Sequence, residues 1–192
     1  DAVEIGAEFS GADLGDLRLS KRLVKIAESV GRSPAAGLPQ VMEDAAALEA
    51  TYRFLGNESV TPEAILAAHV AQTVMRCAGS REVLAVHDRT TFQFGGEKWR
   101  EEMGYMPNGT QGFFGHFTLA VMPGEKREVL GVVGMSGIFR APPPKRRRKK
   151  KHVGPTETND RRRWLDQALE VSETIGATAG VIHVMDREAD IY

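Results

Sequence analysis

The sequence predicts a mixed α/β protein in which a small all-helical domain, residues 1–79, precedes a sheet domain, residues 80–192. Through the first domain, apolar residues recur at helical spacing, which is typical of helices that bury one face. Beyond it the pattern changes to short apolar runs separated by turn residues, which is typical of strands. The runs follow the order strand, hairpin, helix, strand, and this order indicates a mixed sheet with a helix packed on it.

Three helices are expected in the first domain. The first follows Asp16, a suitable N-cap, and ends near Gly31. A second is predicted over residues 41–56. The third starts at Thr61–Pro62, an N-cap followed by proline, and ends near Cys77. The apolar face of the first helix consists of Leu19, Leu23, Ile26, Ala27 and Val30.

In the second domain, residues 82–88 (EVLAVHD) form a short apolar run that ends on an acid. Frequent Gly and Pro predict an irregular segment over 95–115, and residues 116–122 and 128–135 are expected to form a β-hairpin. A helix over 159–176 precedes a last strand, GVIHVMD. The expected buried side of this helix consists of Trp164, Leu165, Ala168, Leu169 and Ser172.

Charge is distributed unevenly along the chain. The net charge is only −1, but residues 140–163 carry eleven basic side chains against Glu157 and Asp160. Such a concentration favours an anionic partner. The sequence has no apolar run near the roughly 20 residues of a membrane span and no signal-peptide pattern, and its single cysteine excludes an internal disulfide. We therefore expect a cytoplasmic protein without membrane contact.

Two apolar strands, VLAVHD and VIHVMD, end on Asp88 and Asp186. If these strands are neighbours, their carboxylates meet at one edge of the sheet, where open α/β folds place their sites. Two like charges in contact are unfavourable unless one is protonated or a cation lies between them. Mg²⁺ or Mn²⁺ suits such oxygen ligands, and a pair of ions about 3.5–4 Å apart supports displacement at phosphorus. The residues thus point to phosphoryl transfer on an anionic polymer.

A structural interpretation of the same residues remains open. Aspartate at a strand end is often a helix cap or a turn residue, and the pattern favours that role for each Asp considered alone. His87 and His183 alternate with the acids along the strands, so they are expected to point away from the Asp side. Ordinary packing is the expectation for both, and we assign them no role.

Several segments resemble one family, the transposon-five-type transposases of the insertion sequence four group of DDE enzymes. DREADIY and HDRTTF are similar to the second- and first-aspartate motifs of that family. LGDLRLSKRLVKIA resembles its LGD-R-x-x-RL helix, residues 49–74 resemble its YRF segment, and DRRRWLDQA resembles the helix before the second-aspartate strand. The resemblance extends, in order, over nearly the whole chain.

The resemblance implies a ribonuclease H-like catalytic domain, preceded by a helical domain that binds transposon ends. It implies a bacterial, nucleoid-associated, cut-and-paste transposase in which Asp88 and Asp186 are catalytic ligands of two Mg²⁺ or Mn²⁺ ions. The implied partners are double-stranded DNA, as terminal inverted repeats and as target, and a second copy in a homodimer on paired ends. The reaction would cut a strand hydrolytically and then join the freed 3′-hydroxyl to target DNA.

The family's third ligand is a glutamate in a Y-R-E-type signature, and the chain shows no such stretch after Asp186. We therefore expect the ribonuclease H-like sheet to be incomplete in this chain and the dimerising region to be absent. Whether the chain is an enzyme stays open. A truncated, catalytically inert DNA-binding remnant and a metal-dependent nuclease that does not transpose are the alternatives.

The candidate DNA-contacting residues are basic and fall in three groups. Four share one face of the first helix, one lies in the YRF segment, and seven form a continuous run that either contacts DNA backbone or is a solvated loop. They are Arg18, Lys21, Arg22 and Lys25; Arg53; and Lys145, Arg146, Arg147, Arg148, Lys149, Lys150 and Lys151. Tyr52 and Phe54, on either side of Arg53, are candidates for the core.

Overall fold

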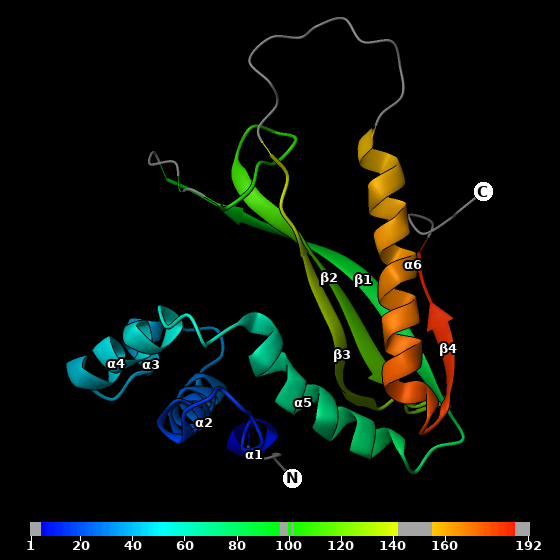
Figure 1. Ribbon diagram of the computed structural model, residues 1–192, viewed down its shortest axis with the longest axis horizontal. Helices are drawn as coiled ribbons and strands as arrows, with labels where there is room; N and C mark the ends of the chain where they lie inside the picture. The colour runs from blue at the N-terminus through cyan, green and yellow to red at the C-terminus, as the bar shows by residue number, and fades with distance from the viewer. Residues whose placement is uncertain (1–4, 97–99, 101, 142–154, 187–192) are drawn as a thin grey trace, which may run out of the picture. The chain divides into compact units, whose positions relative to one another are not determined.

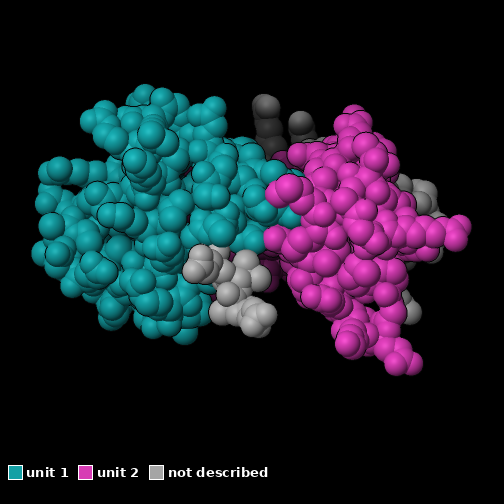
Figure 2. All heavy atoms as spheres, turned by 90° about the horizontal axis from the view of Figure 1, so that it is seen from below, with its two compact units in different colours: residues 1–72 teal, residues 73–192 magenta. Residues whose placement is uncertain are grey.

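The computed structural model describes residues 5–96, 100, 102–141 and 155–186, and within 155–161 it describes the backbone alone. The chain divides into two compact units, residues 1–72 and 73–192, coloured separately in Figure 2. Helices precede a four-stranded mixed sheet (Figure 1), which confirms the predicted fold class. Among the helices built from described residues, none is long and apolar enough to cross a membrane.

Unit 1 contains the short helix α1 (Ile5–Glu8), then α2 (Leu17–Arg32), α3 (Leu38–Val41), α4 (Ala45–Leu55) and most of α5 (Pro62–Cys77). Its core joins the apolar faces of α2, α4 and α5 with the segment before α2. The buried members are Ala12, Leu14, Leu23, Phe54 and Ala68. Two polar contacts support this packing: Ser20 Oγ donates to the Ala12 carbonyl at 2.7 Å, and His69 Nδ1 lies 2.8 Å from Glu8 Oε2.

Helix starts in unit 1 follow the capping residues. The Asp16 carboxylate accepts the Arg18 backbone N–H at 2.8 Å, which confirms the predicted N-cap of α2. The Thr61 hydroxyl accepts the Ala64 N–H at 3.2 Å, which confirms the start of α5. The second helix predicted over 41–56 is confirmed as α4, but it starts later than predicted, because Asp44 caps it by accepting the Ala47 N–H at 2.7 Å. Residues 38–41 form the separate short helix α3.

Unit 2 is built on four strands, β1 (Glu82–Phe94), β2 (Gln111–Val121), β3 (Val129–Ile138) and β4 (Gly180–Val184), in the order β3-β2-β1-β4. The pairs β1–β2 and β2–β3 are antiparallel, and β1–β4 is parallel. The predicted hairpin is confirmed as β2–β3, with both strands longer than expected. A parallel pair needs a crossover, and here α6 (Pro155–Gly176) supplies it before β4.

The sequence predicted that strand β1 ends at residue 88, but the strand continues to Phe94. Residues 89–94 pair with the start of β2, from Arg89 opposite His116 to Phe94 opposite Gln111. Stacked aromatic rings support this extension: the Phe92 and Phe113 centroids lie 4.8 Å apart across the two strands. Cross-strand aromatic pairs of this kind stabilise antiparallel pairing, so the polar residues that follow Arg89 do not stop the strand.

Helix α6 packs on one face of the sheet (Figure 1) and closes the core of unit 2. The buried positions of α6 are Trp164, Gln167, Ala168, Val171 and Ile175. The predicted buried side included Leu165 and Leu169, and this part was wrong because both are exposed. Each lies one residue beyond a buried position, and one residue turns a helix by about 100°. The core face is therefore centred on Val171 and Ile175.

Replacing Ile175, which is 0% exposed, tests this orientation of α6. Ile175→Ala should lower the free energy of unfolding of unit 2 by about 2–5 kcal/mol, because it removes buried methyl groups and leaves a cavity. Leu169→Ala on the exposed side should change it by less than about 0.5 kcal/mol. Denaturant titrations followed by tryptophan fluorescence measure both. Equal destabilisation of the two variants would contradict this orientation.

Candidate functional site

The basic face of α2 lies at the surface of unit 1. Lys21 and Lys25 are exposed, and Arg22 is half-buried. Arg18 is also exposed, but its Nη2 lies 2.9 Å from Asp16 Oδ2. That hydrogen bond lowers the pKa of the Asp16 carboxyl. The N-cap therefore partly neutralises Arg18, and the charge offered outward from α2 comes mainly from Lys21, Arg22 and Lys25.

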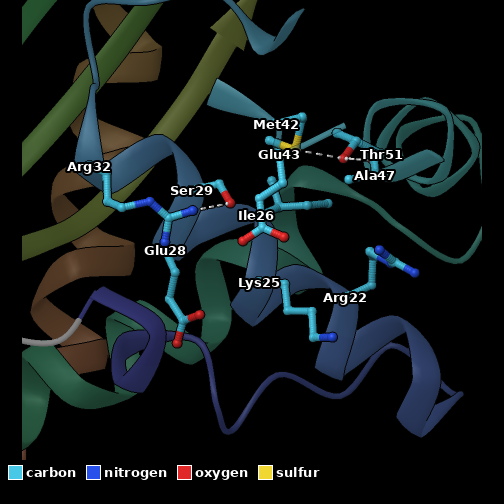
Figure 3. Close-up of a pocket in the computed structure, with 10 residues that line it drawn as sticks. All are labelled: Arg22, Lys25, Ile26, Glu28, Ser29, Arg32, Met42, Glu43, Ala47 and Thr51. Atoms are coloured by element: carbon cyan, nitrogen blue, oxygen red, sulfur yellow. Dashed lines mark hydrogen bonds between the residues drawn. The ribbon is translucent and has the colours of Figure 1, made fainter. Parts of the chain in front are cut away.

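A hollow of about 230 Å³ lies beside this face, between α2 and the α3–α4 segment. In Figure 3 the Arg22 and Lys25 side chains extend from α2 while Glu43 reaches toward it from the opposite wall. Arg32 also lines the hollow, with its Nη2 3.0 Å from Ser29 Oγ. The hollow thus combines cationic donors with carboxylate acceptors.

The YRF segment, Tyr52–Arg53–Phe54, lies on α4. The sequence offered Tyr52 and Phe54 as candidates for the core. Phe54 is buried in the core of unit 1, whereas Tyr52 is 53% exposed and is not a core residue. Arg53 is exposed, and its Nη2 lies 2.5 Å from Glu49 Oε1 one helical turn earlier. Such an exposed pair contributes little to stability. The side chains of Tyr52 and Arg53 are therefore accessible at the surface of α4.

The two predicted acids lie on or just beyond neighbouring strands. Asp186 follows β4 by two residues, and Asp88 lies within β1, two residues past the last β1–β4 pair, Val86 opposite Val184. If the same register continues for two more residues, Asp88 and Asp186 are opposite each other, on strands about 4.8 Å apart. The ladder itself ends at Val86 and Val184, so the adjacency of the two carboxylates stays a prediction. Asp88 lies within β1 and not at a strand end.

Asp88 and Asp186 are both exposed, on the sheet face opposite α6. Their strand neighbours on this face include Ile182 and Val184, which are 47% and 42% exposed. Carboxylates offer the hard oxygen donors that Mg²⁺ and Mn²⁺ prefer, so the chemistry of these two exposed acids fits a divalent ion as part of a ligand set. Among the described residues, no group of three His, Cys, Asp or Glu side chains is placed to hold a metal.

The sheet face under α6 carries three histidines, on β1, β2 and β4. His87 and His116 are buried and His183 is half-buried. His87 Nε2 lies 2.9 Å from His183 Nδ1, and His87 Nδ1 lies 2.9 Å from Thr118 Oγ1 and 3.3 Å from His116 Nε2. The Trp164 ring from α6 packs on His116, with centroids 4.3 Å apart. Alternation correctly predicted that His87 turns away from the Asp side, but it did not reveal these contacts.

All three imidazoles have a lowered pKa. Burial lowers the pKa of His87 to about 4, and the neighbouring His116 and His183 rings add to this effect. Burial likewise lowers the pKa of His116 and of His183. These rings are therefore neutral at physiological pH. The sequence signal that could have revealed the cluster is the presence of His87, His116 and His183 at core-facing positions of predicted strands.

The basic run Lys145 to Lys151 lies outside the described residues, so its contacts stay a prediction. Residues 5–60 match the family model for transposase DNA-binding. The match covers α1 to α4, including the basic face of α2 and Arg53, and ends just before α5. It supports a transposase N-terminal portion over these residues and DNA as the partner of unit 1.

The lowered histidine pKa values predict how stability depends on pH. In the unfolded chain these residues titrate near 6.5, whereas folded His87 has a pKa of about 4. The unfolded state therefore binds more protons in this window, so stability is full above about pH 6.5 and falls as pH decreases toward 4. The decrease attributable to His87 is at most about 3 kcal/mol.

Comparing His87→Gln with the unaltered protein isolates this contribution from the carboxylates that titrate in the same range. Denaturant midpoints measured between pH 4 and 7 should fall less steeply in the variant. Parallel pH profiles for the two proteins would contradict a neutral, buried His87.

Proposed function

We propose that this chain is the DNA-binding and acid-bearing portion of a cut-and-paste DNA transposase. One observation carries the proposal: the transposase DNA-binding match over residues 5–60 is followed, in the same chain, by a mixed sheet with Asp88 on one of two neighbouring parallel strands and Asp186 just beyond the other. Unit 1 recognises the terminal inverted repeats of a transposon, and unit 2 supplies two of the acids for phosphoryl transfer.

Unit 1 binds double-stranded DNA through the basic face of α2. Lys21, Arg22 and Lys25 make sequence-independent contacts to phosphates, which position the domain. The hollow beside them, with Arg32 and Glu43 in its walls, takes the base-edge contacts that distinguish the transposon end from other DNA. The two remaining arginines, Arg18 and Arg53, contribute charge at the margins of this surface, each moderated by its acidic neighbour.

In unit 2, Asp88 and Asp186 hold Mg²⁺ or Mn²⁺. Bound divalent ions stabilise the charge that develops on phosphate oxygens during strand cleavage and strand transfer. The support for this is that both carboxylates are exposed and that each lies two residues past the last pair of the β1–β4 ladder. The ribonuclease H-like assignment of this sheet agrees with its mixed pairing and with an acid on each of two adjacent strand segments.

Two further elements of the proposal rest on the sequence alone. The run Lys145 to Lys151 contacts DNA backbone without regard to sequence, because seven consecutive cationic side chains attract phosphates wherever they lie. Pairing of two DNA ends by a homodimer follows from the family resemblance.

Replacing Lys21 and Lys25 together by alanine tests the DNA-binding face. Affinity should fall, and the slope of log K against log salt should decrease by about one for each phosphate interaction that the substitutions remove. The probe is a duplex enriched by the unaltered protein from a pool of random sequences, with binding followed by fluorescence anisotropy over a salt series.

Lys126→Ala is the matched control, because Lys126 is an exposed lysine in unit 2, between β2 and β3. It should leave affinity for the selected duplex unchanged. If the double variant binds like the unaltered protein, α2 is not the DNA-binding face. If no sequence is enriched from the pool, recognition of a specific end is disproved.

The second test concerns Asp186. Asp186→Asn removes one anionic ligand while keeping the size of the side chain, so Mn²⁺ affinity should fall by about tenfold or more, which corresponds to about 1.4 kcal/mol of binding free energy. Titration followed by Mn²⁺ electron paramagnetic resonance measures it. Duplex binding by unit 1 should be unchanged. Asp166→Asn, at an exposed acid on α6, is the control; equal Mn²⁺ affinity in both variants would refute the metal site.

A further inference from the structure

A chain of hydrogen bonds runs beneath the two acids, on the sheet face that α6 covers. It begins at Ser136 on β3, passes through Gln167 of α6, Thr118 of β2, His87 of β1 and His183 of β4, and ends at Ser172, again on α6. The successive distances are 2.7, 2.8, 2.9, 2.9 and 2.8 Å. These bonds thus link all four strands of the sheet to one helix.

Gln167 determines the direction of the first two bonds. Its Oε1 accepts from the Ser136 hydroxyl, and its Nε2 donates to Thr118 Oγ1. The other three bonds depend on which nitrogen of each imidazole carries the proton. We assign them in one consistent sense: the Thr118 O–H donates to His87 Nδ1, and His87 Nε2–H donates to His183 Nδ1. His183 Nε2–H then donates to the Ser172 hydroxyl.

The contact between His87 and His183 connects strands that otherwise meet through a short ladder. Among the described strands, β4 lies at the edge of the sheet and pairs with β1 alone, over Gly180 to Val184. A slip of one residue in that register would turn His183 to the other face and break its bonds to both His87 and Ser172. The hydrogen-bond chain therefore selects one register out of several that backbone pairing alone permits.

We infer that His87 and His183, anchored by Ser172, are positioning residues that set β4 in register with β1 and so place Asp186 beside Asp88. Both rings lie on the sheet face opposite the acids, so they act on the acids through the strands. The inference deepens the proposed function and rests on it for the role of the two aspartates. The geometry of the hydrogen-bond chain is independent of any metal or DNA.

The first measurement reads the tautomers directly. Long-range ¹H–¹⁵N correlation spectra of the protein at neutral pH should show His87 and His183 protonated at Nε2 and bare at Nδ1. A merely space-filling role would impose no tautomer on either ring. An Nδ1–H tautomer in either ring would overturn the hydrogen-bond chain as assigned.

The second measurement removes the anchor. Ser172→Ala deletes the last acceptor, and amide hydrogen exchange in β4 should become about tenfold faster, as expected when one buried hydrogen bond is removed. Mn²⁺ affinity should fall with it, because Asp186 is no longer held in register. Ser172→Thr keeps a hydroxyl at the same place and should restore both. Thr174→Ala is the control and should change neither, because the Thr174 hydroxyl donates to the Glu170 carbonyl within the same helix.

The outcomes separate this inference from the proposed function. If the tautomers and the exchange effect are found but Asp186→Asn does not alter Mn²⁺ binding, the positioning of β4 stands and the metal site fails. If Asp186→Asn weakens Mn²⁺ binding but Ser172→Ala changes neither exchange nor affinity, the metal site stands and the positioning role is overturned.

Discussion

The parallel pairing of β4 with β1 controls the arrangement of unit 2. These strands are distant in sequence, and within the described part of the sheet β4 pairs through one ladder, Glu82–Val86 against Gly180–Val184. It ends two residues before Asp88 and Asp186, and it brings His183 within hydrogen-bond distance of His87 on the face that α6 covers. Because side chains alternate across a strand, one register sets both faces at once.

The two faces of the sheet carry different chemistry. The face under α6 is closed, with Val171 and Ile175 in its apolar part and neutral histidines in its polar part. Buried polar groups are costly unless they are hydrogen-bonded, and here side chains bond to one another in sequence from Ser136 to Ser172. The other face is open and holds the acids. The α6 side of the sheet is thus closed, whereas the other side leaves the two carboxylates exposed.

In unit 1, local sequence specifies most of the structure. Asp16, Asp44 and Thr61 each cap a helix through a side-chain oxygen. The apolar faces of the helices then form one small core, which leaves Lys21 and Lys25 outward. The match to transposase DNA-binding covers this unit up to residue 60. For the surface of unit 1, the basic residues, the exposed helix face and the family match all support the proposed DNA binding.

Local propensity and periodicity were sufficient to predict the fold class, the caps at Asp16 and Thr61, the β2–β3 hairpin and the strands that lead to the two acids. Tertiary packing decided three features that the local pattern did not predict. They are the continuation of β1 past Asp88, the exposure of Leu169, and the contact between His87 and His183. Each of these depends on a partner far away in the chain: β2 extends β1, the sheet selects the buried face of α6, and the β1–β4 register creates the histidine contact. Local pattern specifies which elements form, whereas non-local packing specifies which residues meet.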